Sequence, residues 1–127
     1  MTKEIIQSDA APKAIGPYSQ GAKFGGFIFL SGQIALNKET LEIIDGDITA
    51  QTEMVLSNIE ALLHETGSDM PHIVKSTIFI TDMGEFSKVN EVYGRFFEKE
   101  PPARSCIEVS ALPKGALVEI EVIAAEK

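Results

Sequence analysis

The chain has 127 residues, 44% of them hydrophobic and 24% charged, which is typical of a globular domain and not of a fibrous or disordered protein. Eleven basic residues against 19 acidic ones give a net charge of -8, so we expect no nucleic acid or anionic membrane as a partner. No run approaches the roughly 20 apolar residues that a membrane span needs.

Residues 1–127 are expected to form a single domain, because this length suits one hydrophobic core. The first residues lack the apolar stretch of a signal peptide. Cys106 is the only cysteine, so no internal disulfide is possible. Together these features predict a cytoplasmic protein in a reducing compartment.

The first third of the chain predicts three short strands. Residues 3–7 are a candidate edge strand, followed by a loop rich in proline and glycine over residues 8–17. Two further β-prone segments, 22–24 and 27–31, flank Gly25–Gly26, a pair typical of a two-residue hairpin turn. The second segment begins with four consecutive apolar residues, which predicts a strand buried on both faces.

Two amphipathic helices are predicted in the middle of the chain. The first begins with Asp47 or Thr49 as its cap and ends near Gly67. A β-branched segment at 73–81 predicts a strand, after which Asp82 begins the second helix. The apolar faces consist of Ile48, Val55, Ile59, Leu62 and Leu63 in the first helix, and of Phe86, Val89, Tyr93, Phe96 and Phe97 in the second.

The last quarter of the chain predicts two strands, 103–111 and 117–124, joined by a turn. In each strand, polar side chains alternate with an apolar row and therefore point to the opposite face. We expect the two strands to form a hairpin with both polar rows on one face. These rows are Arg104, Cys106 and Glu108 in one strand, and Glu119 and Glu121 in the other.

This order of elements predicts an α+β fold, with two helices on one face of a mixed, largely antiparallel sheet. Two helices cover only one face of such a sheet. The strand predicted to be buried on both sides therefore suggests that a second copy of the chain covers the open face. We expect a homo-oligomer.

Arg104 and the glutamates of the last strand have two possible roles. A buried arginine–glutamate ion pair would be purely structural. Alternatively, Arg104 binds the carboxylate of a small molecule, and a neighbouring glutamate whose pKa is raised by burial transfers protons. The alternating pattern does not choose between these roles.

Other catalytic chemistries have less support in the sequence. A nucleophilic Cys106 would need a neighbouring base, and the two histidines, His64 and His72, are both predicted at the surface. His64 begins a pattern similar to that of zinc proteases, but Ser68 stands where the second histidine is required, so no metal site is predicted. No phosphate-binding or dinucleotide motif occurs, so we expect no cofactor.

Five segments, in order along nearly the whole chain, resemble the successive signatures of one known family, the reactive intermediate deaminases (Rid or YjgF type). The resemblance implies a chorismate-mutase-like fold and a homotrimer with clefts between its subunits. It also implies hydrolysis of enamines and imines such as 2-aminoacrylate, as in 2-iminobutanoate/2-iminopropanoate deaminases, without metal or cofactor. The segments are IGPYSQG (15–21), LSGQIALN (30–37), VNEVY (89–93), PPARSCIEV (101–109) and LPKGALVEIEVIA (112–124).

Within this resemblance, Arg104 matches the arginine that holds the substrate carboxylate, and Glu119 the glutamate that moves protons. Two other functions stay open. The first is a non-catalytic protein that binds small 2-oxo acids or acts as a regulatory protein. The second is an RNA-directed ribonuclease or translation inhibitor, which should have a basic surface. The remaining matched positions line the substrate pocket and are Tyr18, Ser31, Gly32, Asn90 and the backbone of Cys106.

Overall fold

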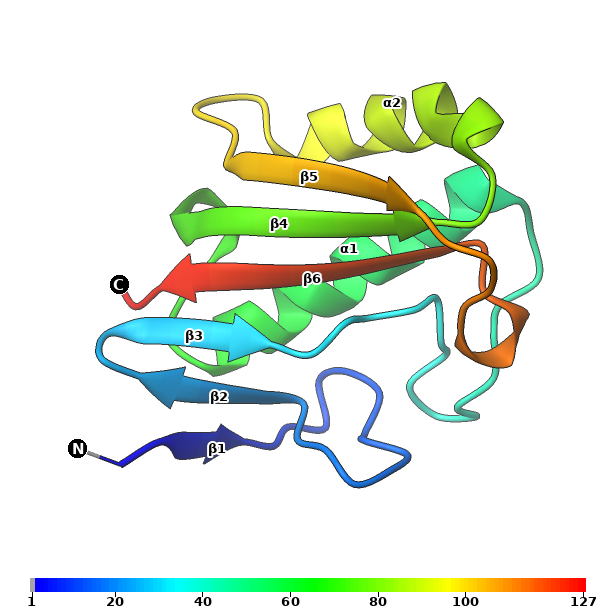
Figure 1. Cartoon of the computed structure of the whole chain (residues 1–127). Helices are drawn as coiled ribbons and strands as arrows, with labels where there is room; N and C mark the ends of the chain where they lie inside the picture. Colours follow the sequence, from blue (N-terminus) through cyan, green and yellow to red (C-terminus); the bar gives the residue numbers. More distant parts are fainter. Residues whose placement is uncertain (1) are drawn as a thin grey trace.

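The computed structural model describes residues 2–127 and arranges them as one six-stranded sheet with two helices on one of its faces (Figure 1). Met1 lies outside the described residues. The elements are β1 (Glu4–Ile6), β2 (Gly21–Phe24), β3 (Phe27–Leu30), α1 (Ile48–Glu65), β4 (Ile73–Ile80), α2 (Phe86–Phe96), β5 (Ala103–Glu108) and β6 (Val118–Ala125).

The strands lie in the order β1-β2-β3-β6-β4-β5. Neighbouring strands are antiparallel, except that β4 and β5 are parallel. The predicted α+β fold, with a mixed and largely antiparallel sheet, is confirmed. The Gly25–Gly26 turn joins β2 to β3 as predicted, and both glycines have the positive φ that such a turn requires.

The start of α1 is fixed by a side-chain cap. Asp47 Oδ1 accepts a hydrogen bond from the backbone N–H of Ala50 at 3.1 Å, so Asp47 and not Thr49 is the cap. The helix ends at Glu65, and Gly67 with a φ of 87° turns the chain away from it.

A short 3₁₀ turn, Met83–Glu85, leads into α2. Asp82 caps this turn by accepting a hydrogen bond from the backbone N–H of Gly84 at 2.9 Å. The face of α2 predicted to be apolar does meet the core, with Val89 and Tyr93 buried.

The hydrophobic core lies between the helices and the sheet. Val55, Ile59 and Leu62 of α1 are fully buried and belong to the same cluster as Ile78 of β4 and Ile120 of β6. Burying a side chain of this size stabilises a fold by roughly 1.5–3 kcal/mol. This one-sided core leaves the other face of the sheet without a helix.

Strand β3 corrects one prediction. Ile28 and Leu30 are buried against the helices, but Phe27 and Phe29 on the opposite face are each 43% exposed. The predicted burial on both faces is therefore wrong for the single chain, because both helices pack on the same side. We call the uncovered side the open face of the sheet.

The relation between the last two strands corrects a second prediction. β5 and β6 do not form a hairpin, because β4 lies between them. Along β4, Ser76 is the partner of Arg104, and its buried side chain places Arg104 on the helix side. Phe79 is the partner of Glu119, which lies on the open face. The two polar rows therefore lie on opposite faces.

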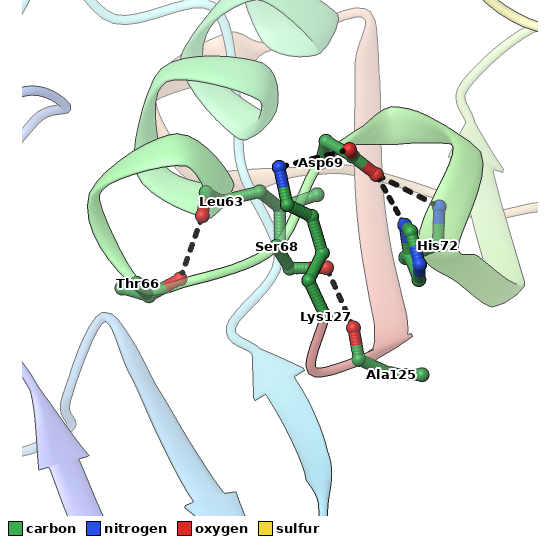
Figure 2. Close-up of polar contacts among 7 residues, drawn as sticks. All are labelled: Leu63, Thr66, Ser68, Asp69, His72, Ala125 and Lys127. Atoms are coloured by element: carbon green, nitrogen blue, oxygen red, sulfur yellow. Dashed lines mark hydrogen bonds and ion pairs between the residues drawn. The ribbon is translucent and has the colours of Figure 1, made fainter.

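The end of β6 is tied to the connection between α1 and β4 (Figure 2). The buried Ser68 donates a hydrogen bond to the carbonyl oxygen of Ala125 at 2.6 Å. Asp69 binds the side chains of both Lys127, at 3.4 Å, and His72, at 2.6 Å. Contacts between residues far apart in sequence thus fasten the C-terminal strand.

Within residues 2–127, neither helix combines the length and the apolar character that crossing a membrane requires.

Candidate functional site

Four of the predicted site residues line one cleft of about 440 Å³ beside the end of β3 and the start of β6. Tyr18 comes from the loop before β2, Ser31 and Gly32 directly follow β3, and Glu119 is the second residue of β6. Ser31 is held in place because its hydroxyl donates to the Ser19 carbonyl at 2.5 Å. The structure therefore brings these four residues together.

The segment after β3 is pressed against β6. Gln33 and Ile120 exchange two backbone hydrogen bonds, of 2.8 and 3.1 Å, just beyond Gly32. As a result, the Glu119 carboxylate lies directly over the Cα of Gly32, where a side chain at that position would overlap it. A side chain at position 32 would therefore force the Glu119 carboxylate to move.

Glu119 is half-buried, and its burial raises the pKa of the carboxyl group above the usual range. The nearby Glu121 carboxylate raises this pKa further, because like charges repel. A glutamate in this state exchanges protons closer to neutral pH than an exposed one does.

Sequence reasoning missed the rest of the cleft wall. Apolar side chains of Ile15, Ile34, Leu36 and Pro113 line it beside Glu119. Ile34 and Leu36 belong to a small separate core formed by the loops before α1 and before β6. They fall in a segment without a clear period, so the alternation of apolar and polar residues gave no signal for them.

Arg104 belongs to a second group of residues, on the helix side of β5. Its Nη1 donates a hydrogen bond to Asn90 Oδ1 of α2 at 2.8 Å. Its Cζ lies 4.9 Å from the ring centroid of Tyr93 and 5.2 Å from that of Phe86, distances at which an aromatic ring attracts a cation. Sequence reasoning treated both aromatic residues as core positions only.

The guanidinium of Arg104 is exposed, and among residues 2–127 no carboxylate forms an ion pair with it. The structural arginine–glutamate pair considered from the sequence therefore does not form within the chain. Asn90 occupies one of the five N–H donors of a guanidinium, so several remain for a bound anion.

Cys106 lies on the same face of β5 as Arg104 and packs against the core. Burial raises the pKa of its thiol, although the Arg104 charge and a backbone hydrogen bond oppose the effect. The thiol therefore stays protonated near neutral pH, which disfavours a nucleophilic role. Nowhere in residues 2–127 do three metal-binding side chains converge.

The predicted site residues thus form two groups on opposite faces of the sheet. We call Tyr18, Ser31, Gly32 and Glu119 the glutamate group, and Arg104, Asn90 and Cys106 the arginine group. Within one chain the two groups do not meet. A site that uses both requires a second copy of the chain.

Comparison with known proteins places this geometry in a family. The family model described as endoribonuclease L-PSP matches residues 8–126. The chain is 53% identical to protein DfrA of Myxococcus xanthus over 126 residues, which cover 98% of this chain and 96% of that protein.

Solved structures agree with this match. YyfA of Yersinia pestis, from the conserved Rid protein family, is 51% identical, with a TM-score of 0.94 over 98% of this chain and 99% of that one. TdcF of E. coli, solved with bound serine, is 42% identical, with a TM-score of 0.92 over 98% and 99%. The chain therefore belongs to the endoribonuclease L-PSP family, which includes the Rid and YjgF-type proteins, and the resemblance identified in the sequence is confirmed.

Proposed function

We propose that this protein hydrolyses reactive enamines and imines of small 2-amino acids, such as 2-aminoacrylate, to 2-oxo acids and ammonium. The observation that carries the proposal is the pairing of two groups: an exposed arginine without a carboxylate partner, and a half-buried glutamate whose pKa is raised. The structure of TdcF with bound serine supports the binding of a small molecule that carries both a carboxylate and an amine.

The active site is shared between copies of the chain. Because the arginine group and the glutamate group lie on opposite faces, a head-to-tail contact brings Arg104 of one copy to Glu119 of the next. Such a contact forms a ring when its rotation closes, and the resemblance to the family implies a closed homotrimer. The exposed apolar residues Phe27, Phe29 and Ile107 on the open face favour burial between copies.

The chemistry follows from these two side chains. Arg104 holds the substrate carboxylate through paired N–H donors, which fixes the imine carbon in position. The Glu119 carboxylate accepts a proton from water as the water oxygen attacks that carbon. Glu119 then gives this proton to the nitrogen, which completes a carbinolamine. The new hydroxyl next loses its proton, Glu119 carries that proton to the nitrogen, the carbon–oxygen double bond forms, the carbon–nitrogen bond breaks, and ammonia leaves. An enamine such as 2-aminoacrylate first takes up a proton at its terminal carbon and loses one from nitrogen to become the imine. One imine and one water give one 2-oxo acid and one ammonia, which takes up a proton to become ammonium.

The decisive experiment measures ammonia release from freshly generated 2-aminoacrylate, after subtraction of the spontaneous rate. Replacing Glu119 by Gln removes the proton carrier and should lower kcat by about 100-fold or more. Glu65→Gln, an exposed change at the end of α1, is the matched control and should keep the wild-type rate. An unchanged rate in Glu119→Gln would exclude this role and leave a protein that only binds 2-oxo acids.

Mixing two inactive variants tests whether the site is shared. If Arg104→Ala and Glu119→Gln chains are unfolded together in equal amounts and refolded, about one quarter of the sites obtain both wild-type residues, whatever the size of the ring. Activity should therefore return to about a quarter of the wild-type value. No recovery, despite mixed oligomers, would show that the two residues do not act across a shared interface.

The family description also includes ribonuclease activity. The net charge of -8 opposes RNA binding. RNA cleavage that weakens as salt rises and is unaffected by Arg104→Ala would favour that function over deamination.

A further inference from the structure

Arg104 is held on several sides before any ligand arrives. Aromatic rings contact it at two places and Asn90 holds one of its nitrogens. All three partners come from a single face of α2, because Phe86, Asn90 and Tyr93 are spaced by four and three residues along the helix. One rigid element therefore determines where the guanidinium of a neighbouring edge strand lies.

Tyr93 is itself held in place by a contact with β4. Its hydroxyl and the hydroxyl of Ser76 are 2.5 Å apart, and Ser76 is completely buried. Ser76 is also the β4 residue that stands beside Arg104 in the sheet. The hydroxyl–hydroxyl contact therefore anchors the Tyr93 ring over the part of β5 from which Arg104 extends.

We propose that Phe86 and Tyr93 are positioning residues that hold the Arg104 guanidinium ready for a substrate carboxylate, with the Ser76 hydroxyl anchoring Tyr93. This proposal rests on the proposed function, in which Arg104 binds that carboxylate. The arrangement suits the binding of a carboxylate, because a cation that lies over aromatic rings uses none of its N–H donors in that contact. The donors that Asn90 leaves free then face the ligand in a defined direction.

Without the rings, an exposed arginine samples many rotamers and must lose that freedom on binding. The rings should help to hold the carboxylate equally in the substrate complex and in the transition state, so their loss should weaken ligand binding without slowing the chemical step. The proposal therefore predicts a higher KM with kcat unchanged.

The test is the affinity of the assembled protein for pyruvate, an unreactive 2-oxo acid, measured by calorimetric titration. Phe86→Leu should weaken binding about two- to fivefold, the effect of one exposed cation–aromatic contact, and should raise KM by the same factor. Tyr93→Phe keeps the ring and should bind pyruvate more tightly than Tyr93→Leu does. Phe96→Leu makes the same change at another partly buried position of α2 and should bind as the wild type does.

A second measurement needs no ligand. Ring currents should displace the proton signal of the Arg104 Nε–H in the wild-type protein, and Phe86→Leu should move that signal toward the value of a free arginine. Because Phe86 is only partly buried, this variant keeps the test available even if Tyr93→Leu fails to fold.

The outcomes separate the two proposals. Weaker binding in Phe86→Leu but not in Phe96→Leu, with the displaced Nε–H signal lost, supports positioning by the rings. Wild-type affinity in Phe86→Leu, while Arg104→Ala loses binding, overturns the positioning role and leaves the proposed function intact. Wild-type affinity in Arg104→Ala overturns both, because Arg104 would then not anchor the carboxylate.

Discussion

In the cleft, the Glu119 carboxylate fills the space that a side chain at position 32 would need, and Gly32 leaves that space free. A methyl group at position 32 would overlap the Glu119 carboxylate and force it to move. In the proposed mechanism, this displacement would take the carboxylate away from water and substrate. Gly32 therefore leaves the Glu119 carboxylate, the proposed proton carrier, in its observed position.

We predict that Gly32→Ala lowers kcat by about tenfold or more, because a displacement of about 1 Å in a reacting group has effects of this order. The measurement is steady-state kinetics with freshly generated 2-aminoacrylate. Gly94→Ala is the matched control, since a Cβ at that exposed helix position meets nothing within 4 Å. It should leave kcat unchanged and stabilise the fold by about 0.5–1 kcal/mol, because alanine favours helix more than glycine does. Equal kinetics in the two variants would contradict the steric role of Gly32.

The raised pKa of Glu119 has consequences for both activity and stability. As a base, Glu119 must be ionised, so kcat/KM should rise with pH through a pKa above the ordinary value of 4.5. In the folded state the protonated form is favoured, so wild-type stability falls as pH rises from the unfolded-state pKa through the folded-state pKa.

The glutamine side chain of the Glu119→Gln variant cannot ionise, so this variant does not lose stability in this way as the pH rises. We therefore predict that the variant has a higher Tm than the wild type at neutral pH, and that the difference shrinks below pH 4. Thermal unfolding followed by circular dichroism at several pH values checks this. A difference in Tm that grows as the pH falls would show that the folded state does not favour protonated Glu119.

At the scale of the elements, the hydrogen bond between Ser68 and the end of β6 could not be predicted from the sequence. Ser68 is buried, and its hydroxyl satisfies the Ala125 carbonyl oxygen. We predict that Ser68→Ala lowers the free energy of unfolding by about 1–3 kcal/mol, because it leaves that oxygen without its side-chain partner.

Chemical denaturation measures this change. Ser87→Ala, an exposed substitution on α2, is the control and should stay within about 0.5 kcal/mol of the wild type. If the two serine variants unfold alike, the contact with Ala125 contributes little to the stability of the fold.

Helices and strands could be located from the sequence because their apolar periods are local. The neighbours in the sheet could not be predicted in the same way. β6 inserts between β3 and β4, and only contacts between distant residues determine that order. The side chains of β5 are mostly exposed on both faces, so its alternation did not show which row turns toward the helices. For this reason the sequence predicted Arg104 and Glu119 on the same face of the sheet, whereas they lie on opposite faces.

The site residues show a similar division. The ordered segments located the residues of both groups, because these residues stand in sequence signatures. The contact of Phe86 and Tyr93 with Arg104 was not predicted, because aromatic residues at helical spacing also suit a core. Tyr93 is indeed buried in the core. No local pattern distinguishes an aromatic residue that only fills a core from one that also contacts a cation.

At the scale of the whole molecule, the proposed shared site would make activity depend on a second copy that covers the open face of the sheet. Replacing Phe29 by Glu places a charge in the centre of the surface that we expect another copy to cover. We predict that this variant is a folded monomer without deaminase activity. Light scattering gives its mass and circular dichroism its fold, while a wild-type mass would show that Phe29 lies outside the interface.

The position of Arg104 on β5 also has a consequence for motion. β5 is an edge strand with no fully buried side chain, joined to the sheet only through β4, so it belongs to the part of the fold that opens most easily. Amide hydrogens of β5 should therefore exchange with solvent faster than those of the central β4 and β6. A ligand that bridges Arg104 to a neighbouring copy should slow that exchange, because it stabilises the paired state of a strand whose arginine side chain α2 already positions in the free protein.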